Sequence, residues 1–172
     1  MRVLVVYFSW TENTRAVADE LVRQLSPHHK VEVCRIEPQK QRGYLRWLLL
    51  SFIPSSKVKI QPAVEDVSKY DAIVLGGPKW TFSCPPVNSY LSRLSGCEGK
   101  NGAIFITYGG FGEDRYLNGL VKKMEAKGLD VRATLLARRS QVRSGEYRSG
   151  VKVFCGEVEA VASMRKETGV VQ

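Results

Sequence analysis

The residues best suited to chemistry follow the first apolar run of the chain. Val3 to Phe8 is predicted to be a buried strand, and the next six residues are Ser9-Trp10-Thr11-Glu12-Asn13-Thr14. Helical spacing of apolar residues from Asn13 to Leu25 predicts a helix there. The first N–H groups of a helix lack intrahelical partners and its N-terminus carries partial positive charge, so this turn is suited to a phosphate. An ordinary helix N-cap uses the same residue types, and that interpretation also stays open.

Several other kinds of site have motifs that this chain lacks. The turn contains no glycine, and the fingerprints G-x-G-x-x-G and G-x-x-x-x-G-K-[ST] are absent, which argues against a dinucleotide-binding Rossmann site and a nucleotide triphosphatase. Neither a Cys-x-x-x-x-x-Arg loop nor a Gly-x-Ser-x-Gly elbow occurs, which argues against a phosphatase or hydrolase. The four cysteines form no C-x-x-C pair, so no zinc or iron–sulfur site is expected. We therefore assign no catalytic side chain and no metal ligand.

The elements that must position the turn alternate along the chain. Apolar runs predict strands, and helical spacing predicts helices between and after them, at Val3–Phe8, Val31–Ile36, Ala72–Gly76, Ala103–Tyr108 and Val131–Leu136 for strands and at Asn13–Leu25, Val87–Leu94, Asp114–Lys127 and Val151–Arg165 for helices. This order predicts an α/β fold, a doubly wound five-stranded parallel sheet in a three-layer α/β/α sandwich. With 172 residues, 44% of them hydrophobic, we expect a single domain over residues 1–172. No segment resembles a membrane span or a signal peptide, so a cytoplasmic location is expected.

Ligands of such sheets bind beyond the carboxyl ends of the strands, where three predicted loops lie. The first loop is Ser9–Thr14, the second runs from Gly77 to Pro86, and the third runs from Tyr108 to Glu113. The second and third loops are rich in aromatic residues and in glycine or proline, so they can present flat apolar faces and bare backbone groups to a planar ring. A phosphate site beside two such loops predicts a pocket for flavin mononucleotide (FMN).

Two of these loops also resemble a known family. Ser9-Trp10-Thr11-Glu12-Asn13-Thr14 is similar to the flavodoxin phosphate-loop signature, hydroxyl-x-Thr-Gly-Asn-Thr. Gly77-Pro78-Lys79-Trp80-Thr81-Phe82, followed by Pro85-Pro86, resembles the second flavin loop of flavodoxin-like proteins, which include NAD(P)H:quinone oxidoreductases. The likeness spans nearly the whole chain. It implies the strand order 2-1-3-4-5 and noncovalent FMN.

The resemblance also implies which residues bind the cofactor. The FMN phosphate would be held by Ser9, Thr11, Asn13 and Thr14, with the backbone of Trp10 and Glu12. The isoalloxazine would be bordered on one side by Pro78, Lys79, Trp80, Thr81, Phe82 and Ser83, and on the other by Thr107, Tyr108, Gly109, Gly110, Phe111 and Gly112. Glu12 stands where the signature has glycine, and a carboxylate near a phosphate is unfavourable unless it points to solvent or pairs with Arg15.

For function, the resemblance implies an FMN flavoprotein that transfers electrons or hydride. An NAD(P)H-linked quinone or flavin-type oxidoreductase with a small quinone-like acceptor is the leading interpretation. A one-electron carrier of the flavodoxin type and a cofactor-free binding protein are the alternatives. The net charge of +9 differs from the acidic surface of electron-carrier flavodoxins, which argues against docking to their basic partners.

A basic cluster near the C-terminus has several possible roles. Its members are Arg132, Arg138, Arg139, Arg143, Arg148 and Lys152. It is compatible with the extra phosphate of NADPH, an acidic partner, a membrane surface or a solvated loop. Aromatic residues are not interleaved with it, which argues against nucleic acid.

One segment breaks the pattern of amphipathic helices. Tyr44 to Ile53 is apolar nearly all round and is followed by Pro54, so we expect a helix with two apolar surfaces to cover. Contact with a second subunit is the preferred interpretation, because Trp47, Leu48 or Phe52 would otherwise be exposed to water. This predicts a homo-oligomer through Tyr44–Ile53. Docking on a membrane surface and full burial under the following loop are the alternatives.

Overall fold

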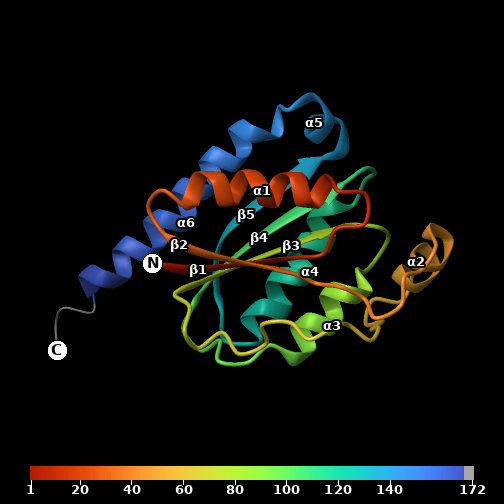
Figure 1. Ribbon diagram of the computed structural model, residues 1–172, viewed down its shortest axis with the longest axis horizontal. Coiled ribbons are helices and arrows are strands. Elements are labelled where there is room, and N and C mark those ends of the chain that lie inside the picture. Colours follow the sequence, from red (N-terminus) through yellow and green to blue (C-terminus); the bar gives the residue numbers. More distant parts are fainter. Residues whose placement is uncertain (169–172) are drawn as a thin grey trace.

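The computed structural model describes the backbone of residues 1–168 and the side chains of residues 1–160. Its centre is a five-stranded parallel sheet with the order β2-β1-β3-β4-β5 (Figure 1). The strands are β1 (Arg2–Tyr7), β2 (Lys30–Arg35), β3 (Ala72–Pro78), β4 (Asn101–Tyr108) and β5 (Asp130–Arg138). The helices are α1 (Asn13–Leu25), α2 (Tyr44–Ser51), α3 (Pro85–Arg93), α4 (Glu113–Glu125), α5 (Arg139–Ser144) and α6 (Tyr147–Thr168). The predicted fold class and strand order are confirmed.

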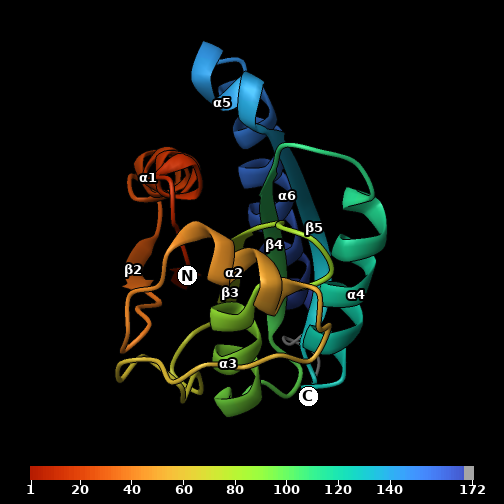
Figure 2. The same cartoon turned by 90° about the vertical axis from the view of Figure 1, so that its right-hand side faces the viewer.

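The period of two along each strand divides the apolar residues between two cores. In β1, Val3 and Val5 pack in the core beneath α1 and α6, whereas Leu4 and Val6 pack in the core beneath α3 and α4. Figure 2 shows the two pairs of helices on opposite faces of the sheet. The central strands β1, β3 and β4 are buried along nearly their whole length, as expected for strands covered on both faces. The edge strands β2 and β5 are partly exposed.

All the strands run in one direction, so their carboxyl ends meet at a single edge of the sheet, on the right in Figure 1. The three predicted loops leave this edge. At the end of β3, a Cβ atom on Gly76 would lie 2.0 Å from Cζ of Phe105, so only glycine lets the ring pack there. The second loop ends at Pro85-Pro86, which begin α3 at positions where no N–H donor is needed.

The segment around α2 projects beyond this carboxyl edge (Figure 1). Its two ends lie side by side, because Pro38 pairs with Ile60 and the Gln39 N–H donates to the Lys59 carbonyl at 2.9 Å. Trp47 is fully buried in its own chain, whereas Leu45 and Leu49 on the other side of the helix are exposed. The prediction of a helix with two apolar surfaces is therefore confirmed. The alternative that the whole helix is buried under the following loop is wrong, because Leu45 and Leu49 are exposed. The expectation that Trp47 lies on the uncovered surface is also wrong, because Trp47 is buried.

The last part of the chain differs from the sequence prediction in one element. A short helix, α5, precedes α6 and carries Arg139 and Arg143, which no apolar periodicity could reveal. Within the described residues, no helix has the combination of length and hydropathy that crossing a bilayer requires.

Candidate functional site

The turn between β1 and α1 leaves several backbone donors free for a ligand. Within the described residues, the N–H groups of residues 10–14 donate to no protein acceptor, whereas the Arg15 N–H donates to Ser9 Oγ at 3.3 Å. The turn opens α1 at Glu12, whose carbonyl accepts the Ala16 N–H at 2.9 Å. Unpaired N–H groups at a helix N-terminus suit an anion.

The side chains of this first loop are linked to each other and to β4. Thr14 and Thr107 are both buried, and their hydroxyl oxygens lie 2.7 Å apart. Asn13 Nδ2 donates to Thr11 Oγ1 at 2.8 Å. A hydroxyl can donate one hydrogen bond and accept others, so Thr107 can donate to Thr14 and leave the Thr14 proton for a ligand. The structure thus brings Thr107 of the third predicted group against the phosphate loop.

Glu12 takes the place of the signature glycine at a backbone position that favours glycine. Its φ is 59°, in the left-handed region, which residues with a Cβ atom enter at a cost. Its carboxylate forms ion pairs with Arg15 at 3.1 Å and with Arg35 at 2.9 Å. Of the two arrangements that the sequence left open for Glu12, exposure to solvent and pairing with Arg15, the structure shows the ion pair on a half-exposed side chain. Arg35 was missed, because it comes from the end of β2 and only the parallel pairing of β1 with β2 brings it here.

An aromatic cluster joins the first loop to the second. The Trp80 ring stacks on Trp47 at a centroid distance of 5.5 Å and meets the Phe8 ring edge-on at 5.7 Å. Trp10 lies 6.4 Å from Trp47 on another side. One face of Trp80 is therefore covered by α2, which holds the second loop in place.

The second and third loops face each other across a cavity of about 760 Å³. Lys79–Phe82 and Gly110–Gly112 line its two sides, and α4 supplies further lining from Arg115 to Lys123. Phe82 and Phe111 have exposed rings at its margin. The cavity is large enough and apolar enough for a planar aromatic ligand.

The other predicted site residues do not line this cavity. Ser83 is buried, and its hydroxyl donates to the Ile53 carbonyl at 2.8 Å, so it fixes the end of α2. The remainder are Pro78, Thr107, Tyr108, Gly109 and the phosphate-loop residues Ser9 to Thr14. The backbone nevertheless connects the two parts, because the Lys79 N–H donates to the Thr107 carbonyl at 2.8 Å.

Sequence reasoning missed the residues of α4 that line the cavity, among them Tyr116 and Lys123. Tyr116 is buried and its hydroxyl has no partner among the described residues, and this burial raises its pKa well above the usual value. Lys123 donates to Asn88 Oδ1 at 2.8 Å, and its pKa is lowered first by burial and then by Lys57. Their spacing of seven places them on one face of the helix, which is the signal that sequence analysis could have used.

The cavity has a positive character. Lys79, Arg115 and Lys123 line it, and none of its lining residues within the described chain is acidic. A ligand with hydrogen-bond acceptors or negative charge would be complementary to these cations.

Part of the basic cluster lies beside the third loop. A Cβ atom on Gly109 would lie 3.3 Å from the guanidinium carbon of Arg139, so the two residues are in contact. A second cavity of about 300 Å³ is lined by Gly109, Arg138, Arg139, Ser140 and Arg143. The fold therefore places three arginines of the cluster near the carboxyl edge, although nothing in the sequence located them there.

Comparisons with known proteins agree with this architecture. No family model matches the chain. An uncharacterized protein of Archaeoglobus fulgidus is 36% identical over 153 residues, covering 85% of this chain and 93% of that protein. Among solved structures, the two-electron reduced flavodoxin of Megasphaera elsdenii is 25% identical, with a TM-score of 0.57, 78% of this chain covered and 85% of that one. A flavoprotein of Lactobacillus acidophilus in complex with FMN is 17% identical, with a TM-score of 0.63, 83% of this chain covered and 97% of that one.

Proposed function

We propose that this chain, whose fold is flavodoxin-like and whose structural neighbours include a flavodoxin and a flavoprotein in complex with FMN, binds FMN and acts as an NAD(P)H-linked oxidoreductase with a small quinone-like acceptor. The observation that supports the proposal most is the β1–α1 turn, whose N–H groups from residue 10 to residue 14 have no protein acceptor within the described residues. It lies at the same edge of the sheet as the large cavity.

The turn fits a phosphate in charge as well as in geometry. Free N–H groups at the start of α1 and the hydroxyls of Ser9, Thr11 and Thr14 can surround phosphate oxygens. The carboxylate of Glu12 would oppose the phosphate, but it is already compensated by Arg15 and Arg35. The sequence contains no pyrophosphate fingerprint, which favours FMN over FAD and NAD.

The cavity between the second and third loops fits the ring system. Bound FMN would supply hydride or electron transfer. The side chains of this protein would bind and orient the reactants: Trp80 as a wall supported by Trp47, and Phe82 and Phe111 as apolar margins.

The electron donor would approach from the other side of the third loop. Arg138, Arg139 and Arg143 line a cavity with Gly109, and a cluster of guanidinium groups suits the phosphates of a pyridine nucleotide. We therefore include NADPH in the proposal as the preferred donor, with NADH as the comparison.

The test is a binding and reduction experiment on the purified chain. Titration calorimetry with FMN, riboflavin and FAD should give the tightest binding for FMN, because only FMN combines the ring with a single terminal phosphate. Anaerobic titration of the FMN-loaded protein with NADH and then NADPH should bleach the visible flavin bands. Equal affinity for riboflavin and FMN would refute the phosphate site. Tight FMN binding without bleaching by either nucleotide would favour the one-electron carrier, and no flavin binding would favour the cofactor-free alternative.

A further inference from the structure

The large apolar side chains that are exposed gather at one end of the molecule. Among the described side chains there are nine, and seven of them lie on α2, just after it, or in the second and third loops. These seven are Tyr44, Leu45, Leu49, Phe52, Ile53, Phe82 and Phe111. Apolar residues scattered singly are normal on a protein surface, whereas a concentration of this kind marks an interaction site.

These residues form a connected surface. The rings of Phe52 and Phe82 are in contact, with centroids 6.1 Å apart, so α2 and the second loop share it. Phe111 lies across the cavity that Phe52 and Phe82 also line. We call this set of seven residues the α2 surface. The helix α2 projects beyond the carboxyl edge of the sheet (Figure 1), so its exposed side chains are accessible to a flat partner.

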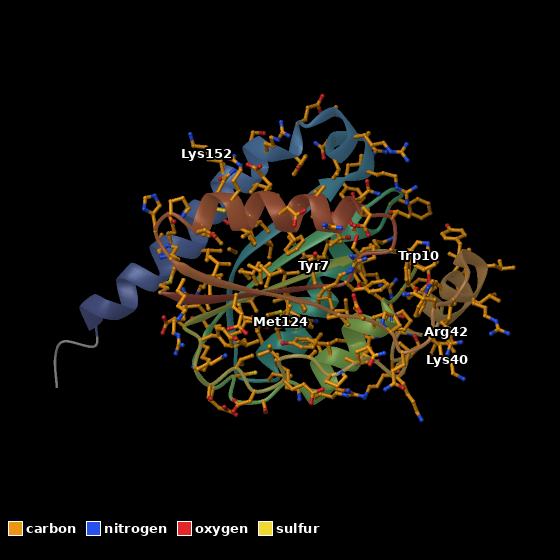
Figure 3. All side chains as sticks on the ribbon, viewed as in Figure 1. Tyr7, Trp10, Lys40, Arg42, Met124 and Lys152 are labelled. Atoms are coloured by element: carbon orange, nitrogen blue, oxygen red, sulfur yellow. The ribbon has the colours of Figure 1, made fainter. Side chains whose placement is uncertain are left out.

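The segment that carries α2 has charge of one sign. Residues 38–64 contain five cationic residues and no aspartate or glutamate. The five are Lys40, Arg42, Arg46, Lys57 and Lys59. Four of them are exposed, and Arg42 lies half-buried with its guanidinium 5.9 Å from the centre of the Trp47 ring. Figure 3 shows Lys40 and Arg42 beside α2.

We propose that the α2 surface docks on an anionic lipid bilayer, with α2 lying in the headgroup region. An apolar helix face surrounded by lysine and arginine binds such a surface through burial of apolar area and through attraction to lipid phosphates. The protein would be a peripheral one, since within the described residues no helix is suited to span a bilayer.

The charge favours lipid over a second copy of the chain. A symmetric dimer through Tyr44–Ile53 would bring the five cations of one copy close to the five of the other, with no acidic residue in the segment to offset them. Anionic lipid headgroups neutralise the same cations. Docking would also direct the large cavity, which Phe52, Phe82 and Phe111 line, toward the bilayer. Access of a lipid-soluble acceptor to that cavity rests on the proposed function, whereas docking itself does not.

The experiment is sedimentation of the full chain with vesicles of phosphatidylcholine, either pure or mixed with phosphatidylglycerol. We expect binding to the mixed vesicles that weakens as salt is raised. The double variant Leu45→Glu/Leu49→Glu should bind at least about tenfold more weakly, because it removes apolar contact and adds like charge to the lipid. Its matched control is Val33→Glu/Val153→Glu, at sites that are 47% and 65% exposed against 67% and 59% for the two leucines. The control should bind as the parent does.

Three results of the sedimentation experiment would overturn the proposal. No binding to the mixed vesicles refutes it, as does equal binding to both vesicle types or an equal loss in both double variants. A parent dimer in light scattering that Leu45→Glu/Leu49→Glu makes monomeric, without vesicle binding by the parent, assigns the α2 surface to a second copy. Thermal unfolding should be alike in all variants. FMN affinity, measured in the same proteins, should not change, so failure of the docking is separable from failure of the cofactor site.

Discussion

Replacing Glu12 by glycine tests how the phosphate turn tolerates a carboxylate. We expect Glu12→Gly to bind FMN more tightly than the parent. The change removes a negative charge from the start of α1, and it frees Arg15 and Arg35, which lie 3.1 Å and 2.9 Å from the carboxylate oxygens. It also introduces the one residue that adopts a φ of 59° without steric strain.

The size of the effect follows from simple electrostatics. At about 6 Å, roughly one helical turn, a carboxylate and a phosphate of charge about −2 repel by about 1.4 kcal/mol in water, which is about tenfold in affinity. Salt at about 0.15 M screens this to about 0.7 kcal/mol, or about threefold. We therefore expect a gain of about threefold at physiological salt and up to about tenfold at low salt.

The stability of the fold should change little. Relief of the left-handed strain contributes about 1–2 kcal/mol. Against it stand two ion pairs of a half-exposed carboxylate, each worth about 0–1 kcal/mol, and the greater backbone entropy of glycine in the unfolded chain, about 0.5–1 kcal/mol. The net change is expected to be within about 1 kcal/mol.

The assay is titration calorimetry with FMN at two salt concentrations, with thermal unfolding in parallel. Glu12→Gln is the matched variant, because it removes the charge and keeps the left-handed strain. If charge decides, both variants bind FMN more tightly than the parent, and the gain in both is larger at the lower salt concentration. A loss of affinity beyond about threefold in Glu12→Gly would show that Glu12 organises the turn, and the reasoning from repulsion would then be wrong.

Four substitutions test other parts of the protein, and a labelling experiment tests a buried thiol. Thr14→Ala should weaken FMN binding by about 1.5–3 kcal/mol in calorimetry, whereas Thr11→Ser retains its hydroxyl and should change it little. Tyr116→Phe should raise the free energy of unfolding by up to about 1 kcal/mol in denaturant titrations, because it removes a buried hydroxyl without a partner in the described chain. Arg139→Ser should raise the KM for NADPH more than that for NADH, and an equal rise for both would place the phosphate elsewhere. Burial raises the pKa of Cys84 to about 12, so mass spectrometry should find it unalkylated by iodoacetamide at mildly alkaline pH in the native protein.

The fold could be predicted because its signals are local. Apolar runs such as Val3–Phe8 and Ala103–Tyr108 identify buried strands, and their alternation with helices leaves few topologies besides a doubly wound sheet. Strand order came from the family resemblance and is confirmed. The helix α5 was missed because six residues rich in arginine carry no apolar period.

The site could be predicted only where its residues adjoin strand ends. Ser9 to Thr14 and Lys79 to Phe82 were found because they directly follow apolar strands. Arg35 and Arg139 were not placed at the site, since each reaches it through strand pairing or a helix connection that no local pattern reports. Tyr116 resembles an ordinary core aromatic in the sequence, and only its buried hydroxyl, which has no partner among the described residues, distinguishes it.

The α2 segment shows why an apolar helix cannot be assigned from composition alone. Its sequence is nearly uniform in hydropathy, so no period separates the face that packs inward from the face that does not. Trp47 is buried because Trp80 and Phe8, from two other loops, provide a surface of matching shape. Leu45 and Leu49 have no such neighbour and stay exposed. The division between the two faces is therefore made by the carboxyl edge of the sheet, the same edge that forms the phosphate turn and the cavity, so a partner bound by the exposed face would lie directly at the site.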